Sequence, residues 1–181
     1  MTHLTERHCE SRGGTLCDAL DGPLGEALST GISDSRFVAA IPQSAGNYEF
    51  LRDGTAEVNI PTLMITATRD QACTEEGSNQ PFWSSLTATQ SPLRNQHRRL
   101  SFLEAGHATF TVACQHLPHL EQDDGCGPDF TPVQEAHQLM LAYSLIFGRA
   151  YVLGDDDALQ SITHDDNLPN RPTWAEWLTA E

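Results

Sequence analysis

The sequence predicts an α/β fold with a mostly parallel sheet and flanking helices. Three short apolar runs, at residues 37–41, 63–66 and 100–103, are bounded by turn residues and indicate strands buried on both faces. A helical segment lies between the second and third runs, so that strand, helix and strand follow one another as in a βαβ unit. A capped amphipathic segment further along the chain predicts a second covering helix.

The sequence signals only the start of the first predicted helix, whereas it signals both ends of the second. The first covers residues 79–86 and begins with residues that favour a helix start. The second covers residues 131–147. Thr131 is its expected N-cap, Gln134 completes a capping box, and Gly148 is its expected C-cap.

The chain divides into three segments of different character. Residues 1–33 lack clear periodicity and predict an irregular N-terminal segment. Residues 34–150 carry the α/β elements. Residues 151–181 form an acidic tail that we expect to be mostly coil, although Trp174 and Trp177 offer apolar surface for docking on the body.

Composition excludes several classes of function. A chain of 181 residues suits one domain with a real core. The net charge is −15 with only 10 Lys and Arg together, which excludes a nucleic-acid partner. No stretch approaches the roughly 20 apolar residues of a membrane span, and the first residues lack the apolar core of a signal peptide.

The five cysteines do not form a CxxC pair, which argues against zinc or thioredoxin chemistry. Their spacing instead offers two local disulfides, Cys9–Cys17 and Cys114–Cys126, with Cys73 left over. Disulfides would favour an exported or periplasmic protein. The alternative is five free thiols in a cytoplasmic protein, and the sequence leaves both open.

Two polar residues follow directly after predicted strands. Asp70 comes after the run at 63–66, and His107 comes after the run at 100–103. Since neighbouring parallel strands lie about 4.8 Å apart, their exit loops can bring these side chains together. A carboxylate bonded to Nδ1 of an imidazole fixes its tautomer and stabilises its protonated form. The alternatives are that Asp70 only caps the following segment and that His107 is an ordinary loop histidine.

The segments IPTLMITATRDQ and LSFLEAGHATF resemble the acid strand and the histidine loop of the α/β-hydrolases. More narrowly, residues 34–148 are similar to the dienelactone-hydrolase and platelet-activating-factor-acetylhydrolase-like branch. The resemblance implies a partial α/β-hydrolase fold without its N-terminal strands. It also implies a serine-hydrolase-type carboxylic ester hydrolase with Asp70 as acid, His107 as base, a small-molecule ester substrate, and neither cofactor nor metal.

The nucleophile is the missing part of this pattern, because no G-x-S-x-G motif is present. Ser44, in PQSAG, is the remaining candidate, but its surroundings differ from the motif and a turn rather than a helix is expected after it. Two hypotheses follow. Either the serine comes from upstream sequence or another chain, or the protein is a non-catalytic, truncated remnant. In both cases we expect the isolated chain to be a poor or inactive esterase.

The remaining candidates have simpler interpretations. Four further histidines are interpreted as surface residues, and the run Asp155–Asp157 as solvated charge rather than a cation site. The histidines are His97, His116, His119 and His137. A half-sheet would also expose an edge strand, through which the chain could associate with itself.

Overall fold

A three-stranded sheet forms the centre of the computed structural model. β1 (Leu63–Ala67) pairs in parallel with β2 (Arg98–Phe102), and β2 pairs antiparallel with β3 (Ala175–Thr179). Every residue of β1 and β2 is buried, as expected for strands covered on both faces. The structure describes residues 15–23, 25, 26, 34–46, 48, 54–88, 93–117, 119, 122–163 and 172–179.

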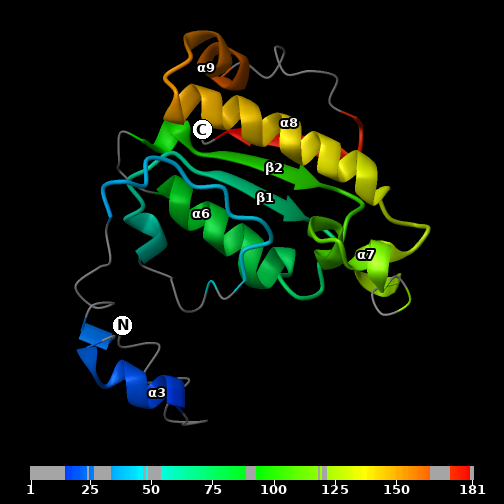
Figure 1. The fold of residues 1–181 in the computed structure, drawn as a ribbon, viewed down its shortest axis with the longest axis horizontal. Coiled ribbons are helices and arrows are strands. Elements are labelled where there is room, and N and C mark those ends of the chain that lie inside the picture. Colours follow the sequence, from blue (N-terminus) through cyan, green and yellow to red (C-terminus); the bar gives the residue numbers. More distant parts are fainter. Residues whose placement is uncertain are drawn as a thin grey trace.

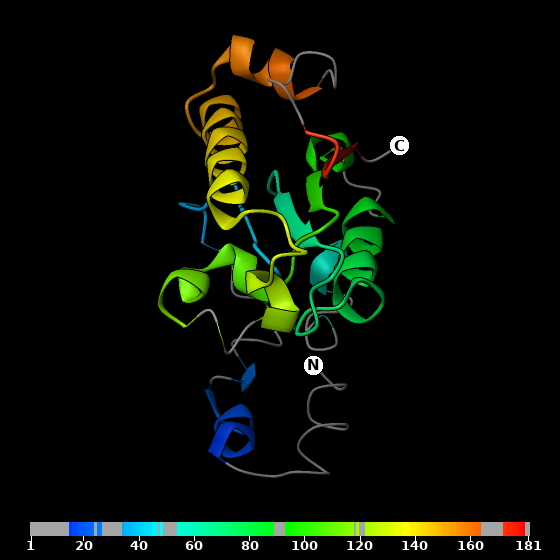
Figure 2. The ribbon, with the colours of Figure 1, turned by 90° about the vertical axis from the view of Figure 1, so that its right-hand side faces the viewer.

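Helices cover the sheet on both faces, and Figures 1 and 2 show the resulting three layers. α8 (Val133–Val152) lies on one face, and α6 (Gln80–Ala88) lies on the other. The larger core cluster joins alternate sheet residues to α8 and includes Leu63, Ile65, Leu100, Phe102, Met140, Tyr143 and Phe147. The smaller cluster joins Met64 of β1 to Phe82, Trp83 and Leu86 of α6. Alternate residues of β1 thus enter opposite layers, which follows from the two-residue period of a strand.

Shorter helical elements complete the described fold. They are α3 (Thr15–Leu20), η2 (Glu75–Asn79), η3 (Arg94–Gln96), η4 (His107–Phe110), α7 (Ala113–His116), η5 (Gln122–Cys126) and α9 (Asp156–Thr163). Of these, α9 packs on α8, and η4, α7 and η5 cluster at the end of the sheet where β1 and β2 finish. The candidate site lies at that end.

The predicted parallel order of the three apolar runs is confirmed, but the first run is not a strand. Ala40 bridges Thr62 and Gln43 bridges Ile65, both in parallel, and these are isolated bridges outside the named strands. The run is not buried on both faces either, since Phe37 is 67% exposed. This segment lies along one edge of β1, and β3 forms the opposite edge of the sheet.

The predicted ends of the last helix are wrong. α8 begins at Val133, its N-cap is Pro132, and no side chain caps it. Thr131 is buried, and its hydroxyl has no hydrogen-bond partner among the described residues. The helix also continues through Gly148 to Val152, because a glycine is tolerated inside a helix whose neighbouring turns are held by core contacts.

The prediction of a coil tail is also wrong, since residues 151–181 contain α9 and β3. Asp155 caps α9 by accepting the backbone N–H of Ala158 at 3.0 Å, and it pairs with Arg149. Ile162 and Trp177 are buried in the larger core cluster. The tail therefore belongs to the same core as the central segment, and the expected docking of its tryptophans takes the form of a strand.

The Cys114–Cys126 disulfide is present, with Cα atoms 5.0 Å apart. Cys17 is also disulfide-bonded, while Cys9 lies outside the described residues. Cys73 is a free, buried thiol. None of the described helices combines the length and the apolar composition that a membrane span requires.

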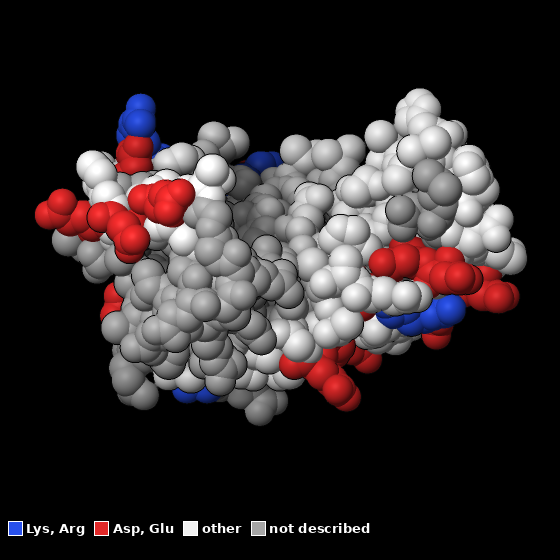
Figure 3. Space-filling view, turned by 90° about the horizontal axis from the view of Figure 1, so that it is seen from below, with Lys and Arg blue, Asp and Glu red and all other residues white. Residues whose placement is uncertain are grey.

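Acidic side chains outnumber basic ones on the face seen in Figure 3, in keeping with the net charge of −15. Two of the predicted surface histidines are in fact enclosed. His97 is fully buried, and His137 is partly buried with Nε2 2.8 Å from the carbonyl of Thr109. His97 precedes Arg98 and Arg99, and His137 falls on the polar side of the predicted helix, which is why the pattern predicted exposure.

Candidate active site

Asp70 and His107 meet at the carboxyl ends of β1 and β2, as predicted. The exit loops are tied together by backbone bonds, from Thr68 N–H to the Phe102 carbonyl at 2.9 Å and from Arg69 N–H to the Ala105 carbonyl at 3.1 Å. These bonds continue the parallel pairing beyond the strands. They bring Nδ1 of His107 to 3.1 Å from Oδ2 of Asp70.

The carboxylate of Asp70 is fully buried, and its two oxygens have separate tasks. Oδ1 accepts the backbone N–H groups of Ala72 at 2.9 Å and Cys73 at 2.6 Å, which holds the loop in an Asx-type turn. Oδ2 faces His107 and Ser44. The expected alternative, that Asp70 only caps the following segment, is wrong, because Thr74 caps η2 by accepting the backbone N–H of Gly77 at 3.1 Å. Oδ1 of Asp70 instead holds the loop, and Oδ2 is available to orient the imidazole.

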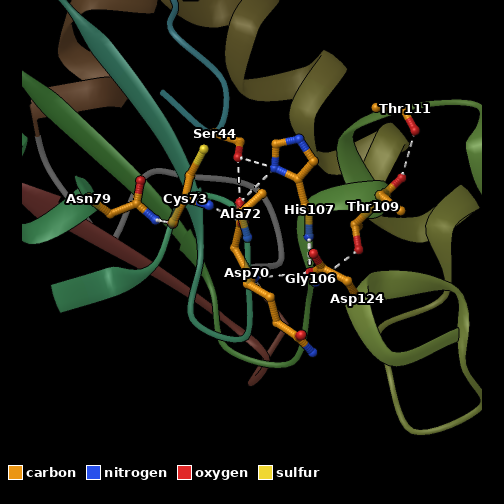
Figure 4. A network of polar contacts seen from close by, with 12 residues as sticks. Ser44, Asp70, Ala72, Cys73, Asn79, Gly106, His107, Thr109, Thr111 and Asp124 are labelled. Carbon is orange, nitrogen blue, oxygen red and sulfur yellow. Dashed lines mark hydrogen bonds and ion pairs between the residues drawn. The ribbon is translucent and has the colours of Figure 1, made fainter. Parts of the chain in front are cut away.

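Ser44 joins the pair from the segment beside β1. Its backbone N–H donates to the carbonyl of Ile65 at 2.9 Å, and its hydroxyl donates to Oδ2 of Asp70. The same hydroxyl oxygen lies 2.9 Å from Nδ1 of His107. Figure 4 shows the three side chains pointing toward one another.

The backbone of Ser44 is strained, with a φ of +45° in the left-handed region. Such conformations cost residues other than glycine roughly 1–3 kcal/mol, and they cluster at functional sites. The residues that follow are partly helical, since Tyr48 and residues 54–56 have helical geometry. The expectation that a turn rather than a helix follows Ser44 concerns residues 47–54, and most of these lie outside the described residues.

The tautomer of His107 follows from its neighbours. A carboxylate can only accept, so the ring nitrogen facing Asp70 carries the hydrogen, and Nε2 keeps its lone pair. The imidazole is 41% exposed, and Nε2 is directed away from Asp70 and Ser44 (Figure 4). No described residue is hydrogen-bonded to Nε2. This nitrogen is therefore available to take a proton.

Cys73 is a neighbour that the sequence interpretation did not assign to the site. Burial raises the pKa of its thiol, and the charges of Asp70 and Asp124 raise it further, against a hydrogen bond with Ser44 that lowers it. The carbonyl of Cys73 accepts a bond from the buried Asn79 side chain at 2.8 Å. Because the thiolate is the reactive form, the raised pKa makes the Cys73 thiol a poor nucleophile here.

Asp70, Cys73 and His107 place one carboxylate oxygen, one sulfur and one ring nitrogen within 4.8 Å of one another. These are ligand types that suit Zn²⁺. However, the carboxylate and the ring nitrogen are joined by a direct contact of 3.1 Å. A metal ion would have to break that contact, so the arrangement fits an acid–histidine pair better.

Asp124 was also missed by the sequence interpretation. Its Oδ1 accepts the backbone N–H of His107 at 2.7 Å and that of Gln71 at 3.2 Å. The available signal was its place in the polar QDDG run just before Cys126, where Gly125 adopts a φ of +121°. That pattern indicates a tight turn but not what the turn contacts.

A surface hollow of about 350 Å³ lies beside the loop that follows β1 and carries Asp70. Its walls include Arg69, Gln71, Asp123 and Phe130. Neither Ser44 nor the Asp70–His107 pair lines it. The hollow is therefore separate from the reacting groups.

Two of the four histidines interpreted as surface residues do lie on the surface, as predicted. His116 ends α7, and His119 follows it shortly after; both are exposed. Neither belongs to the group of side chains around Asp70.

No protein-family model matches this chain, and no curated protein matches it either.

Proposed function

We propose that Asp70 and His107 are the acid and the base of a serine-hydrolase-type carboxylic ester hydrolase. The observation that carries the proposal is the 3.1 Å contact of Nδ1 with the buried Asp70 carboxylate, with Nε2 directed to the exposed side. This is the arrangement in which an imidazole can serve as general base.

The reaction uses each ring nitrogen differently. A serine hydroxyl placed at Nε2 attacks the ester carbonyl carbon, and its proton passes to Nε2. The imidazolium, stabilised by Asp70, then returns that proton to the leaving alkoxide as the acyl-serine forms. Water hydrolyses the acyl-serine by the same sequence of proton transfers.

Ser44 does not fit the role of this nucleophile in the arrangement described. Its oxygen contacts Nδ1, which Asp70 already occupies, and its proton is directed to the carboxylate. The hydroxyl that reacts at Nε2 must therefore come from outside the described residues, or Ser44 must move around the ring. The second candidate function, a non-catalytic chain, is favoured by the same observation.

Hydrolysis of a short activated ester by the purified chain tests the proposal. We expect slow turnover that falls to the uncatalysed rate in His107→Ala and Asp70→Asn. His116→Ala is the matched control, since it removes an exposed histidine away from the site. Equal rates in all four proteins would contradict the proposal and support a non-catalytic chain.

Covalent labelling with a fluorophosphonate locates the nucleophile. If the probe labels a serine other than Ser44, and labelling requires His107, the reacting hydroxyl lies outside the described residues. Labelling at Ser44 would instead show that this side chain moves to Nε2. Either result identifies the atom that His107 activates.

A further inference from the structure

One carboxylate oxygen joins the two loops that carry Asp70 and His107. Asp124 Oδ1 accepts the backbone N–H of His107 at 2.7 Å and the backbone N–H of Gln71 at 3.2 Å. Gln71 directly follows Asp70 in the sequence. Figure 4 shows Asp124 beside the backbone of His107, on the side away from the imidazole. A displacement of Asp124 therefore affects both loops at once.

The segment that carries Asp124 is held against these loops by close backbone approaches. Gln71 Nε2 donates to the carbonyl of Asp123 at 2.6 Å. A Cβ on Gly106 would lie 2.4 Å from the carbonyl carbon of Asp124, so a side chain there is excluded. Gly125 has a φ of +121°, which favours glycine, and a Cβ at this position would lie 2.8 Å from the backbone nitrogen of Thr109. The contact thus depends on two glycines that permit it.

The Cys114–Cys126 disulfide closes the segment that carries Asp124. Cys114 lies in α7, just after the histidine loop, and Cys126 ends η5, which contains Asp124. The bridge spans 12 residues, so it restricts how far Asp124 can move from η4 and α7. The disulfide and the hydrogen bonds of the Asp124 carboxylate therefore restrain the same element, η5.

From these contacts we infer that Asp124 is a positioning residue. It fixes the backbone of His107 relative to Asp70, and the Cys114–Cys126 disulfide keeps Asp124 in place. A carboxylate suits this role because its bonds to backbone N–H groups are stronger than those of a neutral acceptor. The effect on ester hydrolysis rests on the proposed function, whereas the effect on the geometry of the two loops does not.

Amide hydrogen exchange and the imidazole proton spectrum of the whole chain test this role without requiring activity. In Asp124→Ala we expect the amides of His107 and Gln71 to exchange about tenfold faster, because each loses its acceptor. The downfield Nδ1 proton resonance of His107 should broaden or vanish. Amides of β1 and β2 should keep their protection.

Two variants keep the test specific. Asp124→Asn retains an acceptor oxygen, and we expect it to restore protection to within about threefold of the wild type. Asp123→Ala removes the neighbouring carboxylate but keeps the backbone carbonyl that binds Gln71, so it should leave both amides unchanged. Unchanged protection of His107 in Asp124→Ala, or equal loss in Asp123→Ala, would overturn the inference.

The disulfide is tested by mild reduction and by Cys126→Ser. Both should accelerate exchange at His107 and Gln71 more than at the sheet amides. If protection at these two positions survives reduction, the disulfide has no part in positioning. If the amides respond to Asp124→Ala but no variant affects hydrolysis, the positioning role stands and the proposed function fails. Where hydrolysis is measured, we expect Asp124→Ala to lower kcat with little change in KM.

Discussion

Ser44 Oγ and His107 Nδ1 lie 2.9 Å apart, on the side of the imidazole that also faces Asp70. The hydroxyl donates to Oδ2 of Asp70, so it supports the acid rather than the reacting nitrogen. A serine in this position contributes to the orientation of the carboxylate, at the cost of a strained backbone.

Replacements at Ser44 should separate these two effects. Both Ser44→Ala and Ser44→Gly lose the hydroxyl, which removes a hydrogen bond to a charged group worth about 1.5–3 kcal/mol. Only glycine adopts a φ of +45° without strain. We therefore expect Ser44→Gly to be more stable than Ser44→Ala by about 1 kcal/mol in urea denaturation. The reverse order would show that backbone strain at this position does not limit stability.

The ion pair between the buried Arg99 and the partly exposed Glu75 should contribute strongly to the stability of the segment that follows β1. Arg99 is 2% exposed, and its guanidinium contacts Glu75 at 2.5 Å and Thr66 Oγ1 at 3.0 Å. Glu75→Ala leaves this charge without its carboxylate, at a cost of about 3 kcal/mol. Thermal denaturation measures the loss. The adjacent, exposed Glu76→Ala is the matched control and should change stability by less than about 0.5 kcal/mol.

Acid should destabilise the protein through His97. Burial, and secondarily the charge of Arg98, lower the pKa of this imidazole from its ordinary value of 6.5. The unfolded chain therefore binds a proton below about pH 6.5 that the folded chain does not, and stability falls as pH falls, by up to about 1.4 kcal/mol per pH unit. Above about pH 6.5 the residue contributes no pH dependence.

Replacing His97 by leucine tests this assignment. Neither ring nitrogen has a partner among the described residues, so His97→Leu removes no hydrogen bond and abolishes the proton uptake. We expect the slope of stability between about pH 6.5 and pH 5 to flatten in His97→Leu and to persist in His116→Leu. Urea denaturation at several pH values provides the slopes, and an unchanged slope in His97→Leu would exclude this histidine as the source.

The sequence predicted the part of the fold that local patterns determine. β1 and β2 were found because their residues form short buried runs, and the Asp70–His107 contact followed from strand exits that lie side by side. β3 was missed because AEWLT has a weak alternation and its pairing partner is distant in sequence. Asp124 was missed for the same reason, since its function depends on loops brought to it by the fold.

The buried thiol of Cys73 should be unreactive in the folded protein. It is 6% exposed, and burial raises its pKa, so little thiolate forms at neutral pH. We expect negligible alkylation by iodoacetamide at about pH 7.5 without denaturant, and modification at Cys73 once the chain is unfolded in urea. Peptide mapping of the modified residue provides the measurement. Rapid labelling of Cys73 in the folded chain would show that the loop after Asp70 opens readily.

The two oxygens of Asp70 predict a contrast between its asparagine and alanine variants. The side-chain amide in Asp70→Asn keeps an acceptor oxygen for the backbone N–H groups of Ala72 and Cys73, so this variant should retain most of the stability. Asp70→Ala loses both amide bonds inside a buried site and should be destabilised by about 2–4 kcal/mol. Thermal denaturation of the two variants distinguishes these outcomes.

Activity should not follow this order of stability. In Asp70→Asn the amide group that faces His107 can donate to Nδ1, which moves the ring hydrogen to Nε2 and removes the lone pair that the base requires. Any His107-dependent hydrolysis should then fall by several orders of magnitude, to about the level of Asp70→Ala. Nitrogen NMR of the imidazole reports the tautomer directly. A stable Asp70→Asn variant with an unchanged tautomer and undiminished hydrolysis would contradict this prediction. It would mean that the Asp70 carboxylate only stabilises its own loop and that His107 acts without it.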